Sequence, residues 1–307
     1  MNAARKAFTK TLLELAKEDP TIFALATDSR GSVTLNDFVK ELPNQFVECG
    51  IAEQDAVGMA AGLSNLGLKP FVCGPASFYS TRAAEQVKVD VAYSHVNVKV
   101  IGVSGGVSYG ALGGTHHAIQ DIAFFRAVPN LQVIIPADAN QAAAMTRALV
   151  QSPEPAYVRM GRGDVPDVYG EDAPFEIGKA NTLREGKDGA VIACGEMVKP
   201  ALDAADLLAA EGIHVTVIDM HTIKPLDEEA VLKAAETGAV VTAEEHIIRG
   251  GLGGAVAEVI CQHNPVKMKI LGLPDETVYS GTSAEVFAHY HLNAEGIAAA
   301  MKQLLRA

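Results

Sequence analysis

One carboxylate, Glu53, stands where a predicted strand gives way to a predicted helix. The strand is the apolar run QFVEC at 45–49, and the helix is EQDAVGMAAGLSNLG, whose glycines and alanines allow close packing on a sheet. A glutamate in the first turn of a helix is commonly there because the macrodipole favours a negative charge. In a cleft, the same carboxyl can exchange a proton with a bound ligand. Its position leaves a structural and a catalytic interpretation open.

Two further segments carry aromatic or histidine side chains just after predicted strands. The segment GPASFYSTRAAEQVK at 74–88 has Phe78 and Tyr79 between a strand and a helix, where an aromatic side chain usually belongs to the core. The segment 104–130 is dense in glycine, as a loop pressed against a ligand would be, and it carries two adjacent histidines. Paired histidines without carboxylate or cysteine neighbours do not indicate a metal site, so no metal ligand is predicted in this chain.

Together these segments resemble the transketolase family of thiamine diphosphate (ThDP) enzymes. The resemblance rests on GIAEQ at 50–54, R-A-x-E-Q at 82–86, G-x-T-H at 113–116 and R-A-V-P-N at 126–130. Further along, VIDMHTIKPLDEEAV and VVTAEEHIIRGGLGGAVAEVI resemble the C-terminal domain of transketolases and of 1-deoxyxylulose-5-phosphate synthase. In the family this domain is mainly structural and dimer-forming. The resemblance covers essentially the whole chain, from Arg5 to the last helix.

The resemblance implies roles for three side chains in the chemistry. Glu53 matches the glutamate that hydrogen-bonds the aminopyrimidine ring of ThDP and promotes the imino form that deprotonates the thiazolium carbon. Phe78 matches the ring that stacks on the pyrimidine, with Tyr79 as the alternative. His116 matches the histidine that lies over the reacting carbons and donates hydrogen bonds to the sugar. We interpret Arg82 as an interface or structural residue.

Other matches fall on the cofactor and substrate sides of the family's site. Asp28 and Ser29 lie in TDSRGS, where the cofactor-side loop would be, and Ser32 of the same segment is assigned to the substrate. Arg5 in A-A-R-K-A and Arg159 in AYVRM match groups that bind the substrate or its phosphate. A lone arginine is normally a solvated surface residue, and that interpretation stays open for both.

Two positions depart from the transketolase pattern. Leu112 stands where transketolases place an aspartate that binds a donor-sugar hydroxyl, and Ser104 stands where a histidine helps to hold the sugar phosphate. The cofactor contacts are kept while the substrate contacts are altered. We therefore expect a preference for branched or modified sugar phosphates, or for a sulfonate, over the substrates of ordinary transketolases.

Half of a ThDP site is missing from the sequence. We find no G-D-G segment followed about thirty residues later by an Asn-containing metal loop, the pattern that holds diphosphate and Mg²⁺. The chain is expected to be the C-terminal section of a split transketolase, which moves a two-carbon ketol unit from a ketose phosphate or modified ketose to an aldose. The expected partner is an N-terminal section carrying the diphosphate and Mg²⁺ site, in an α2β2 assembly with a β–β contact. Activity is expected only with that partner.

Other proteins share parts of this pattern. The β subunit of a 2-oxo acid dehydrogenase or decarboxylase has the same two-domain plan, and a 1-deoxyxylulose-5-phosphate synthase-like enzyme shares the second-domain motifs. GIAEQ, the T-H-H loop, and TIKPLD with TAEEH favour the transketolase branch. A non-catalytic regulatory paralogue is the alternative of another class, and the presence of both Glu53 and Phe78 argues against it.

The elements that must position these residues form two predicted α/β domains, each a mostly parallel sheet covered by helices. A chain of 307 residues is long enough for two such domains. Short apolar runs alternate with helical patterns, which predicts parallel strands buried on both faces. In the first half these runs lie at 22–27, 45–49, 70–74, 96–103, 131–136 and 156–160. Glycine, proline and charge then concentrate, so we predict a pyrimidine-binding domain at 1–170, a linker at 171–187 and a C-terminal domain at 188–307.

Composition excludes several classes of function. The formal net charge of -12 argues against nucleic acid or an anionic membrane surface as a partner. The four cysteines form no CxxC pair, which predicts neither a disulfide framework nor a metal site. The N-terminus resembles an amphipathic helix rather than a signal peptide, and no run is apolar enough to span a bilayer. A soluble, cytoplasmic protein is expected.

Overall fold

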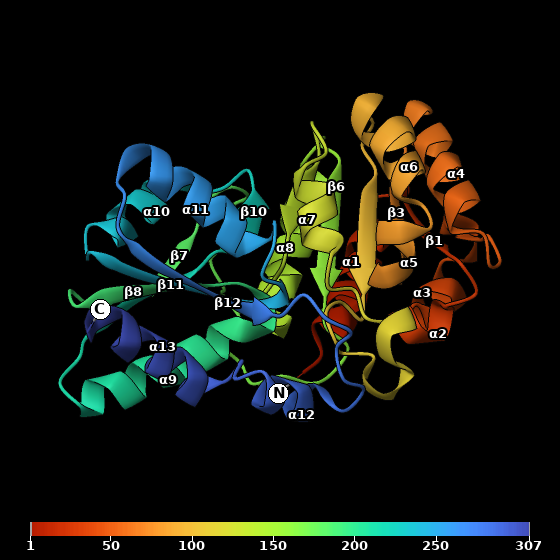
Figure 1. The fold of residues 1–307 in the computed structure, drawn as a ribbon. Helices are drawn as coiled ribbons and strands as arrows, with labels where there is room; N and C mark the ends of the chain where they lie inside the picture. Colours follow the sequence, from red (N-terminus) through yellow and green to blue (C-terminus); the bar gives the residue numbers. More distant parts are fainter. Residues whose placement is uncertain (1, 307) are drawn as a thin grey trace.

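Six strands of the first domain form a parallel sheet, and one antiparallel strand from the second domain extends it (Figure 1). The computed structural model describes residues 2–306, apart from the side chain of Ala111. The strand order is β10-β5-β6-β4-β3-β1-β2. The strands are β1 (Ile22–Ala26), β2 (Phe46–Glu48), β3 (Lys69–Pro75), β4 (Lys99–Val103), β5 (Gln132–Ile134), β6 (Ala156–Met160) and β10 (Thr222–Lys224).

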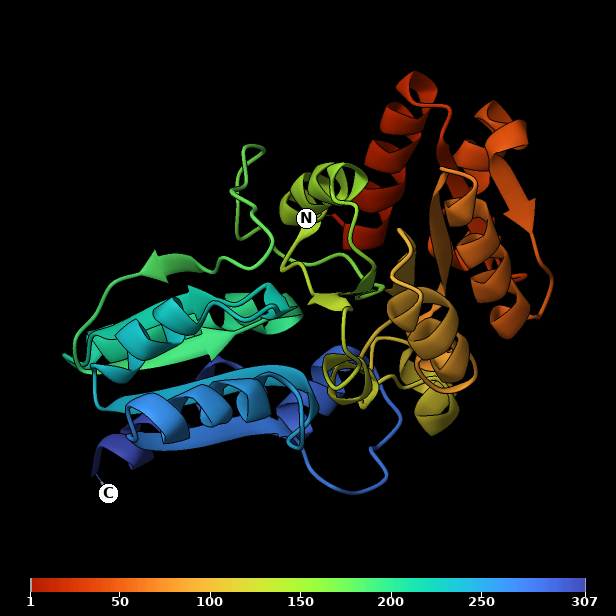
Figure 2. The same ribbon diagram turned by 90° about the horizontal axis from the view of Figure 1, so that it is seen from above.

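Helices cover both faces of this sheet, which is why its central strands are buried along almost their whole length. On one face, α1 (Ala4–Glu18) packs beside α8 (Ala139–Gln151), and α1 buries Phe8 and Leu12 at a spacing of one helical turn (Figure 2). The other face is covered by α4 (Glu53–Asn65), the π-helical segment η2 (Val87–Tyr93) and α7 (Asp121–Arg126). The short helices are α2 (Arg30–Val33), α3 (Asn36–Glu41), η1 (Pro43–Gln45), α5 (Ala76–Thr81), α6 (Ala84–Gln86) and η3 (Gly110–Thr115).

The second domain has a five-stranded sheet in the order β12-β11-β8-β9-β7, parallel except for β7. Its strands are β7 (Asn181–Arg184), β8 (Gly189–Ala193), β9 (Val215–Asp219), β11 (Ala239–Ile247) and β12 (Lys267–Leu273). Its helices are η4 (Gly195–Met197), α9 (Val198–Ala210), α10 (Glu228–Ala235), α11 (Leu252–His263), α12 (Ser283–His289) and α13 (Ala294–Arg306). Two mostly parallel sheets flanked by helices confirm the predicted fold class.

Two strands depart from the expected division of the chain. β7 lies within the predicted linker at 171–187, and it pairs with β9 of the second sheet. β10 lies in the sequence of the second domain, but it pairs with β5 of the first sheet, Thr222 opposite Ile134. β7 has four residues and β10 has three, and neither contains the longer apolar run that marks a buried strand. Hydrophobic periodicity therefore could not predict either strand. The exact domain boundaries stay a prediction.

The two domains share one hydrophobic cluster. It runs from Val57 on α4 and Val100 on β4 to Val240 on β11 and Val256 on α11. Packing of this kind holds the second domain firmly against the first sheet. Within residues 2–306, no helix combines the length and apolar character needed to cross a membrane.

Candidate functional site

The predicted site residues follow the carboxyl ends of neighbouring strands in the first sheet. Ser32 follows β1, Glu53 follows β2, Phe78 follows β3, and His116 follows β4. Parallel strands bring their carboxyl ends to one edge of a sheet, where open α/β sheets bind ligands. The contacts below join these residues into one continuous set, which we call the site row: Glu53, Arg82, Phe78, His116, Tyr109, Ser32, Arg5 and Arg162.

At one end of the site row, Glu53 presents a buried carboxylate. It is the first residue of α4, where the unpaired N–H groups of the helix favour a negative charge. Its side chain is 1% exposed, and its Oε2 accepts a hydrogen bond of 2.9 Å from Nη1 of Arg82. The guanidinium comes from the residue that follows α5, and its side chain is 46% exposed. A buried acid is thus paired with a cation that reaches solvent.

Three rings continue the site row. The guanidinium carbon of Arg82 lies 4.2 Å from the ring centroid of half-buried Phe78. The His116 ring centroid is 5.4 Å from that of Phe78 and 5.1 Å from that of Tyr109, which meets it edge-on. The Nδ1 atom of His116 lies 2.9 Å from the hydroxyl of Thr115, which orients the imidazole. Phe78 and His116, assigned by resemblance to cofactor and substrate, therefore lie side by side.

The far end of the site row is cationic. The Tyr109 hydroxyl donates a 3.3 Å hydrogen bond to the hydroxyl of Ser32, and the Arg162 guanidinium carbon lies 4.7 Å from the Tyr109 ring centroid. Arg5 donates from Nε to the carbonyl oxygen of Arg162 at 2.9 Å and from Nη1 to the carbonyl oxygen of Ser32. Burial and the adjacent Arg162 lower the pKa of Arg5. In the described part of the chain, Nη1 of Arg162 is buried without a hydrogen-bond partner. An anion would satisfy both guanidiniums.

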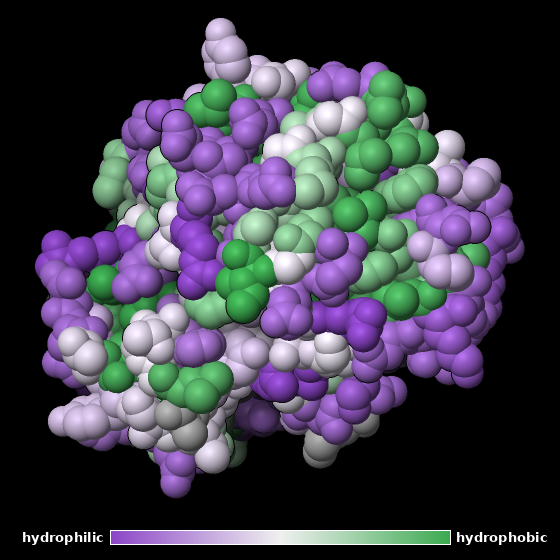
Figure 3. Space-filling model, turned by 90° about the vertical axis from the view of Figure 1, so that its right-hand side faces the viewer, coloured by the Kyte–Doolittle hydropathy of each residue, from purple (hydrophilic) through white to green (hydrophobic). Residues whose placement is uncertain are grey.

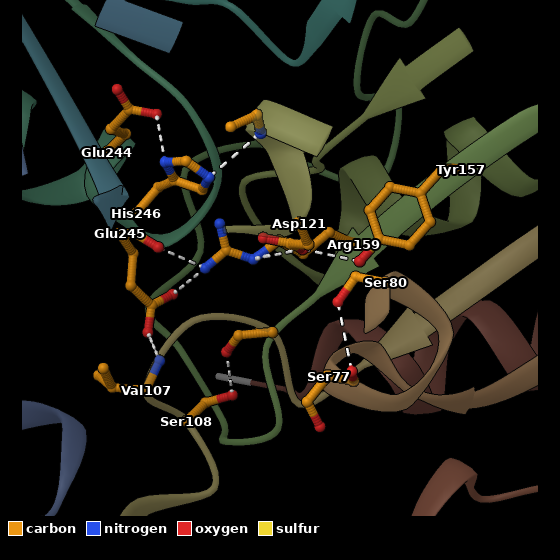
Figure 4. Close-up of polar contacts among 12 residues, drawn as sticks. Ser77, Ser80, Val107, Ser108, Asp121, Tyr157, Arg159, Glu244, Glu245 and His246 are labelled. Atoms are coloured by element: carbon orange, nitrogen blue, oxygen red, sulfur yellow. Dashed lines mark hydrogen bonds and ion pairs between the residues drawn. The ribbon is translucent and has the colours of Figure 1, made fainter. Parts of the chain in front are cut away.

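Arg159, expected to bind substrate, lies in a different place (Figure 4). Its side chain is 4% exposed, and its Nη2 donates to the carbonyl oxygen of Glu245 at 2.6 Å and to Oε2 of Glu245 at 3.1 Å. Its Nε lies 3.7 Å from Oδ2 of Asp121, which also accepts a 2.7 Å hydrogen bond from the Tyr157 hydroxyl. We call these four residues the interdomain cluster. Arg159 is therefore paired with two buried carboxylates, and no described contact joins it to the site row to which the resemblance assigned it.

The interdomain cluster joins the glycine-rich loop to the second domain. Oε1 of Glu245 accepts a 2.8 Å hydrogen bond from the Val107 N–H, and burial raises the pKa of Glu245 to about 8 while Arg159 acts in the opposite direction (Figure 4). A Cβ added to Gly106, whose φ is +60°, would collide with the Glu245 carboxyl and with Arg159. These first glycines of the loop are therefore pressed against the cluster, not against a ligand.

The remaining predicted residues lie near the site row without joining it through any described contact. Asp28 is exposed, its φ is 54°, and its N–H donates to Oε1 of Glu48 at 2.8 Å. Ser29 is half-buried beside it. Leu112 is 52% exposed on η3, ahead of His116. Ser104 is fully buried with a φ of 58°, so its hydroxyl does not reach the surface of the site.

Comparisons with known proteins identify the family of both domains. The family model for the transketolase pyrimidine-binding domain matches residues 1–167, and that for the transketolase C-terminal domain matches residues 178–297. An apulose-4-phosphate transketolase subunit of Phocaeicola vulgatus is 58% identical over 97% of this chain and 96% of its own length. The 6-deoxy-6-sulfo-D-fructose transketolase subunit SqwH of Clostridium sp. (strain MSTE9) is 39% identical over 88% and 84%. A split gene transketolase, solved as an inactive beta4 tetramer, superposes with a TM-score of 0.93 and 40% identity over 100% and 99% of the two chains.

The two sheets match the pyrimidine-binding domain and the C-terminal domain of transketolases, which are ThDP enzymes. The chain belongs to the transketolase family, as a counterpart of the chains that carry the pyrimidine-binding and C-terminal domains in split transketolases. It is a transketolase subunit, and membership of this family implies dependence on ThDP.

The residues present fit the aminopyrimidine ring of that cofactor. Such a ring needs a carboxyl that can share a proton with a ring nitrogen and a flat apolar face, and the site row offers Glu53 and Phe78 for these roles. Both lie within reach of one planar group, because the Arg82 guanidinium contacts the Phe78 ring while it hydrogen-bonds Glu53.

Sequence interpretation missed Tyr109 and Arg162, and it gave Arg82 no part in the site. No motif marks Tyr109. Arg162 could have been found, because it follows the end of β6, whereas Arg159 lies inside that strand. Ligands of open α/β sheets lie beyond the carboxyl ends of strands, and that rule favours Arg162.

Proposed function

We propose that this chain, together with an N-terminal section, transfers a two-carbon ketol unit from a ketose phosphate with a branched or otherwise modified carbon skeleton. The observation that carries the proposal is the site row, which joins a cofactor-side carboxylate to an anion-binding end. The names of the two relatives support it, since apulose 4-phosphate and 6-deoxy-6-sulfo-D-fructose are both modified ketoses with an anionic group.

The residues of the row divide the chemistry between them. Bound ThDP supplies the carbon that attacks the ketose carbonyl. Glu53 holds a proton between its carboxyl and the aminopyrimidine ring, and Phe78 fixes the plane of that ring. His116, next to Phe78, donates a hydrogen bond to the oxygen on the reacting carbon, and Thr115 holds its other nitrogen.

The phosphate of the ketose is bound by Arg5 and Arg162. Support comes from the contact between these two arginines and from the buried, unpartnered Nη1 of Arg162. A tetrahedral anion can accept from both guanidiniums, and it removes their mutual repulsion. The Ser32 and Tyr109 hydroxyls lie beside them as further donors.

Leu112 makes the enzyme prefer donor ketoses with a modified carbon skeleton. Its exposed side chain lies on η3, the short helix that ends just before His116, and it offers no acceptor for a sugar hydroxyl. An apolar side chain at this place accommodates a branch and does not penalise a missing hydroxyl. Discrimination between donors should therefore differ from that of an enzyme with aspartate here.

The partner docks on the face that carries α4. Large apolar side chains are exposed along it: Ile51 at 75%, Met59 at 38% and Leu66 at 79%, with Val89 and Tyr93 on the adjoining η2. Figure 3 shows apolar side chains gathered on this side of the molecule. Patches of this kind mark interfaces. Because α4 begins with Glu53, an N-terminal section seated here would bring its diphosphate and Mg²⁺ site to the pyrimidine, giving an α2β2 enzyme.

The test is reconstitution. The chain and an N-terminal section are purified separately and assayed alone and together with ThDP, Mg²⁺, apulose 4-phosphate and an aldose phosphate acceptor. Turnover is expected only in the mixture, with a mass corresponding to α2β2. Xylulose 5-phosphate is the matched control donor, and we expect it to be used less efficiently.

Three outcomes would contradict the proposal. Substantial sugar transfer by the isolated chain would refute the split site. Efficient condensation of pyruvate with glyceraldehyde 3-phosphate would indicate a 1-deoxyxylulose-5-phosphate synthase-like activity instead. Preference for xylulose 5-phosphate over every modified ketose would remove the role given to Leu112.

A further inference from the structure

Arg82 contacts both groups that the proposed function assigns to the aminopyrimidine ring. Its Nη1 donates to Oε2 of Glu53 at 2.9 Å, and its guanidinium carbon lies 4.2 Å from the Phe78 ring centroid. A guanidinium is planar and presents N–H donors in its plane, as an aminopyrimidine does. Two flat groups cannot occupy the same face of Phe78 while bonding the same oxygen of Glu53.

We propose that Arg82 occupies the aminopyrimidine position in the cofactor-free chain and is displaced when the cofactor binds. This inference rests on the proposed function, because it requires ThDP at Glu53. It changes the interpretation of Arg82 from an interface or structural residue to one that competes with the cofactor.

The surroundings of Arg82 explain why it takes this place. Glu53 is 1% exposed, and a buried carboxylate without a counter-charge is strongly destabilising. Pairing with Arg82 compensates that charge until another donor arrives. In residues 2–306, the described hydrogen bonds of the Arg82 side chain go to Glu53 alone.

The same surroundings allow Arg82 to leave. Its side chain is 46% exposed, and its backbone lies at the C-terminal end of the six-residue helix α5. A long, half-exposed arginine can turn its guanidinium to water without unpacking the core. Displacement exchanges one planar partner of Glu53 for another. The carboxyl that accepted from Arg82 then shares a proton with the ring, so Glu53 is not left as an unpaired buried charge.

Competition of this kind lowers the apparent affinity for the cofactor. Only the fraction of chains in which Arg82 has moved away is ready to bind, and the observed dissociation constant rises by the inverse of that fraction. Removing the guanidinium should therefore tighten cofactor binding, which is opposite to the effect of removing a residue that helps to hold the ring.

The experiment measures binding of ThDP with Mg²⁺ to the reconstituted complex by titration calorimetry. Arg82→Met keeps the length of the side chain and removes its donors, and we expect a dissociation constant about three- to tenfold lower than in wild type. Arg147→Met is the matched control, because Arg147 is an exposed arginine on α8 without a described contact, and no change is expected. Without cofactor, Arg82→Met should melt earlier than wild type, and saturating ThDP should close that gap.

The outcomes separate this inference from the proposed function. If the wild-type complex does not bind ThDP, the proposed function itself is wrong. If wild type binds and Arg82→Met binds equally or more weakly, the proposed function stands and the competition is refuted. Should Arg82→Met fail to assemble, Arg82→Gln, a shorter and uncharged variant, is judged by the same criterion.

Discussion

Arg159 and Arg162 are three residues apart in the sequence, yet they belong to two polar regions with opposite properties. Arg159 lies within β6, is 4% exposed and pairs with Glu245 and Asp121 in the interdomain cluster. Arg162 follows the strand, is half-buried in the site row and has a nitrogen without a described partner. One region joins the domains through buried ion pairs, whereas the other presents a cationic donor, Nη1 of Arg162, that no described protein group accepts.

The difference shows how to separate structural from functional charge in this fold. A buried arginine paired with buried carboxylates of the protein stabilises contacts within the protein itself. A pair of adjacent arginines with a buried, unmet donor is costly unless a ligand accepts from it. The partners of a charged side chain therefore decide its role, and the following predictions test that distinction.

The largest effect is expected at Glu53. Glu53→Gln should lower turnover of the reconstituted enzyme by at least about 100-fold, because an amide cannot share a proton with the ring as the acid does. Steady-state kinetics measure the loss, and size-exclusion chromatography should show an unchanged assembly. Near-wild-type turnover in an intact complex would remove Glu53 from the chemistry.

Arg159→Leu should lower the free energy of unfolding. Removing the guanidinium leaves Glu245 and Asp121 buried without their cation, which typically costs about 3–5 kcal/mol. Urea unfolding of the isolated chain measures the loss. Arg162→Leu is the matched control and should cost far less. A stable Arg159→Leu variant with a raised KM for the donor phosphate would reverse the two roles.

Arg162→Met should weaken the binding of a phosphorylated donor. Loss of one charge-assisted contact, worth about 1.5–3 kcal/mol, should raise the KM for a phosphorylated donor about ten- to 100-fold. The KM for an unphosphorylated ketose, measured in parallel, should hardly change. An equal rise for both donors would place the phosphate elsewhere.

The smallest effect is expected at Leu112. Leu112→Asp should shift the ratio of kcat/KM values for xylulose 5-phosphate and apulose 4-phosphate several-fold towards the former, since an acceptor for a sugar hydroxyl is restored at an exposed position. Leu112→Asn, which lacks the charge, is the companion variant. An unchanged ratio would show that this side chain does not contact the donor.

Much of the fold was predictable because it depends on local pattern. The alternation of apolar runs with helical segments predicted two mostly parallel sheets, and the two observed sheets confirm it. β7 and β10 were not predicted, because short antiparallel edge strands are chosen by their partners and not by their own hydrophobicity.

By itself, the sequence determined the motifs that resemble the transketolase family, and that resemblance predicted Glu53, Phe78, His116, Ser32 and Arg5 as site residues, together with Arg159, Asp28 and Ser29. The tertiary structure alone decided that Tyr109 lies between His116 and Ser32, that Arg159 faces the second domain, and that Arg82 contacts both Glu53 and Phe78. The physical reason is that strand order brings residues to an edge, whereas a side chain's partners depend on packing between segments far apart in the chain.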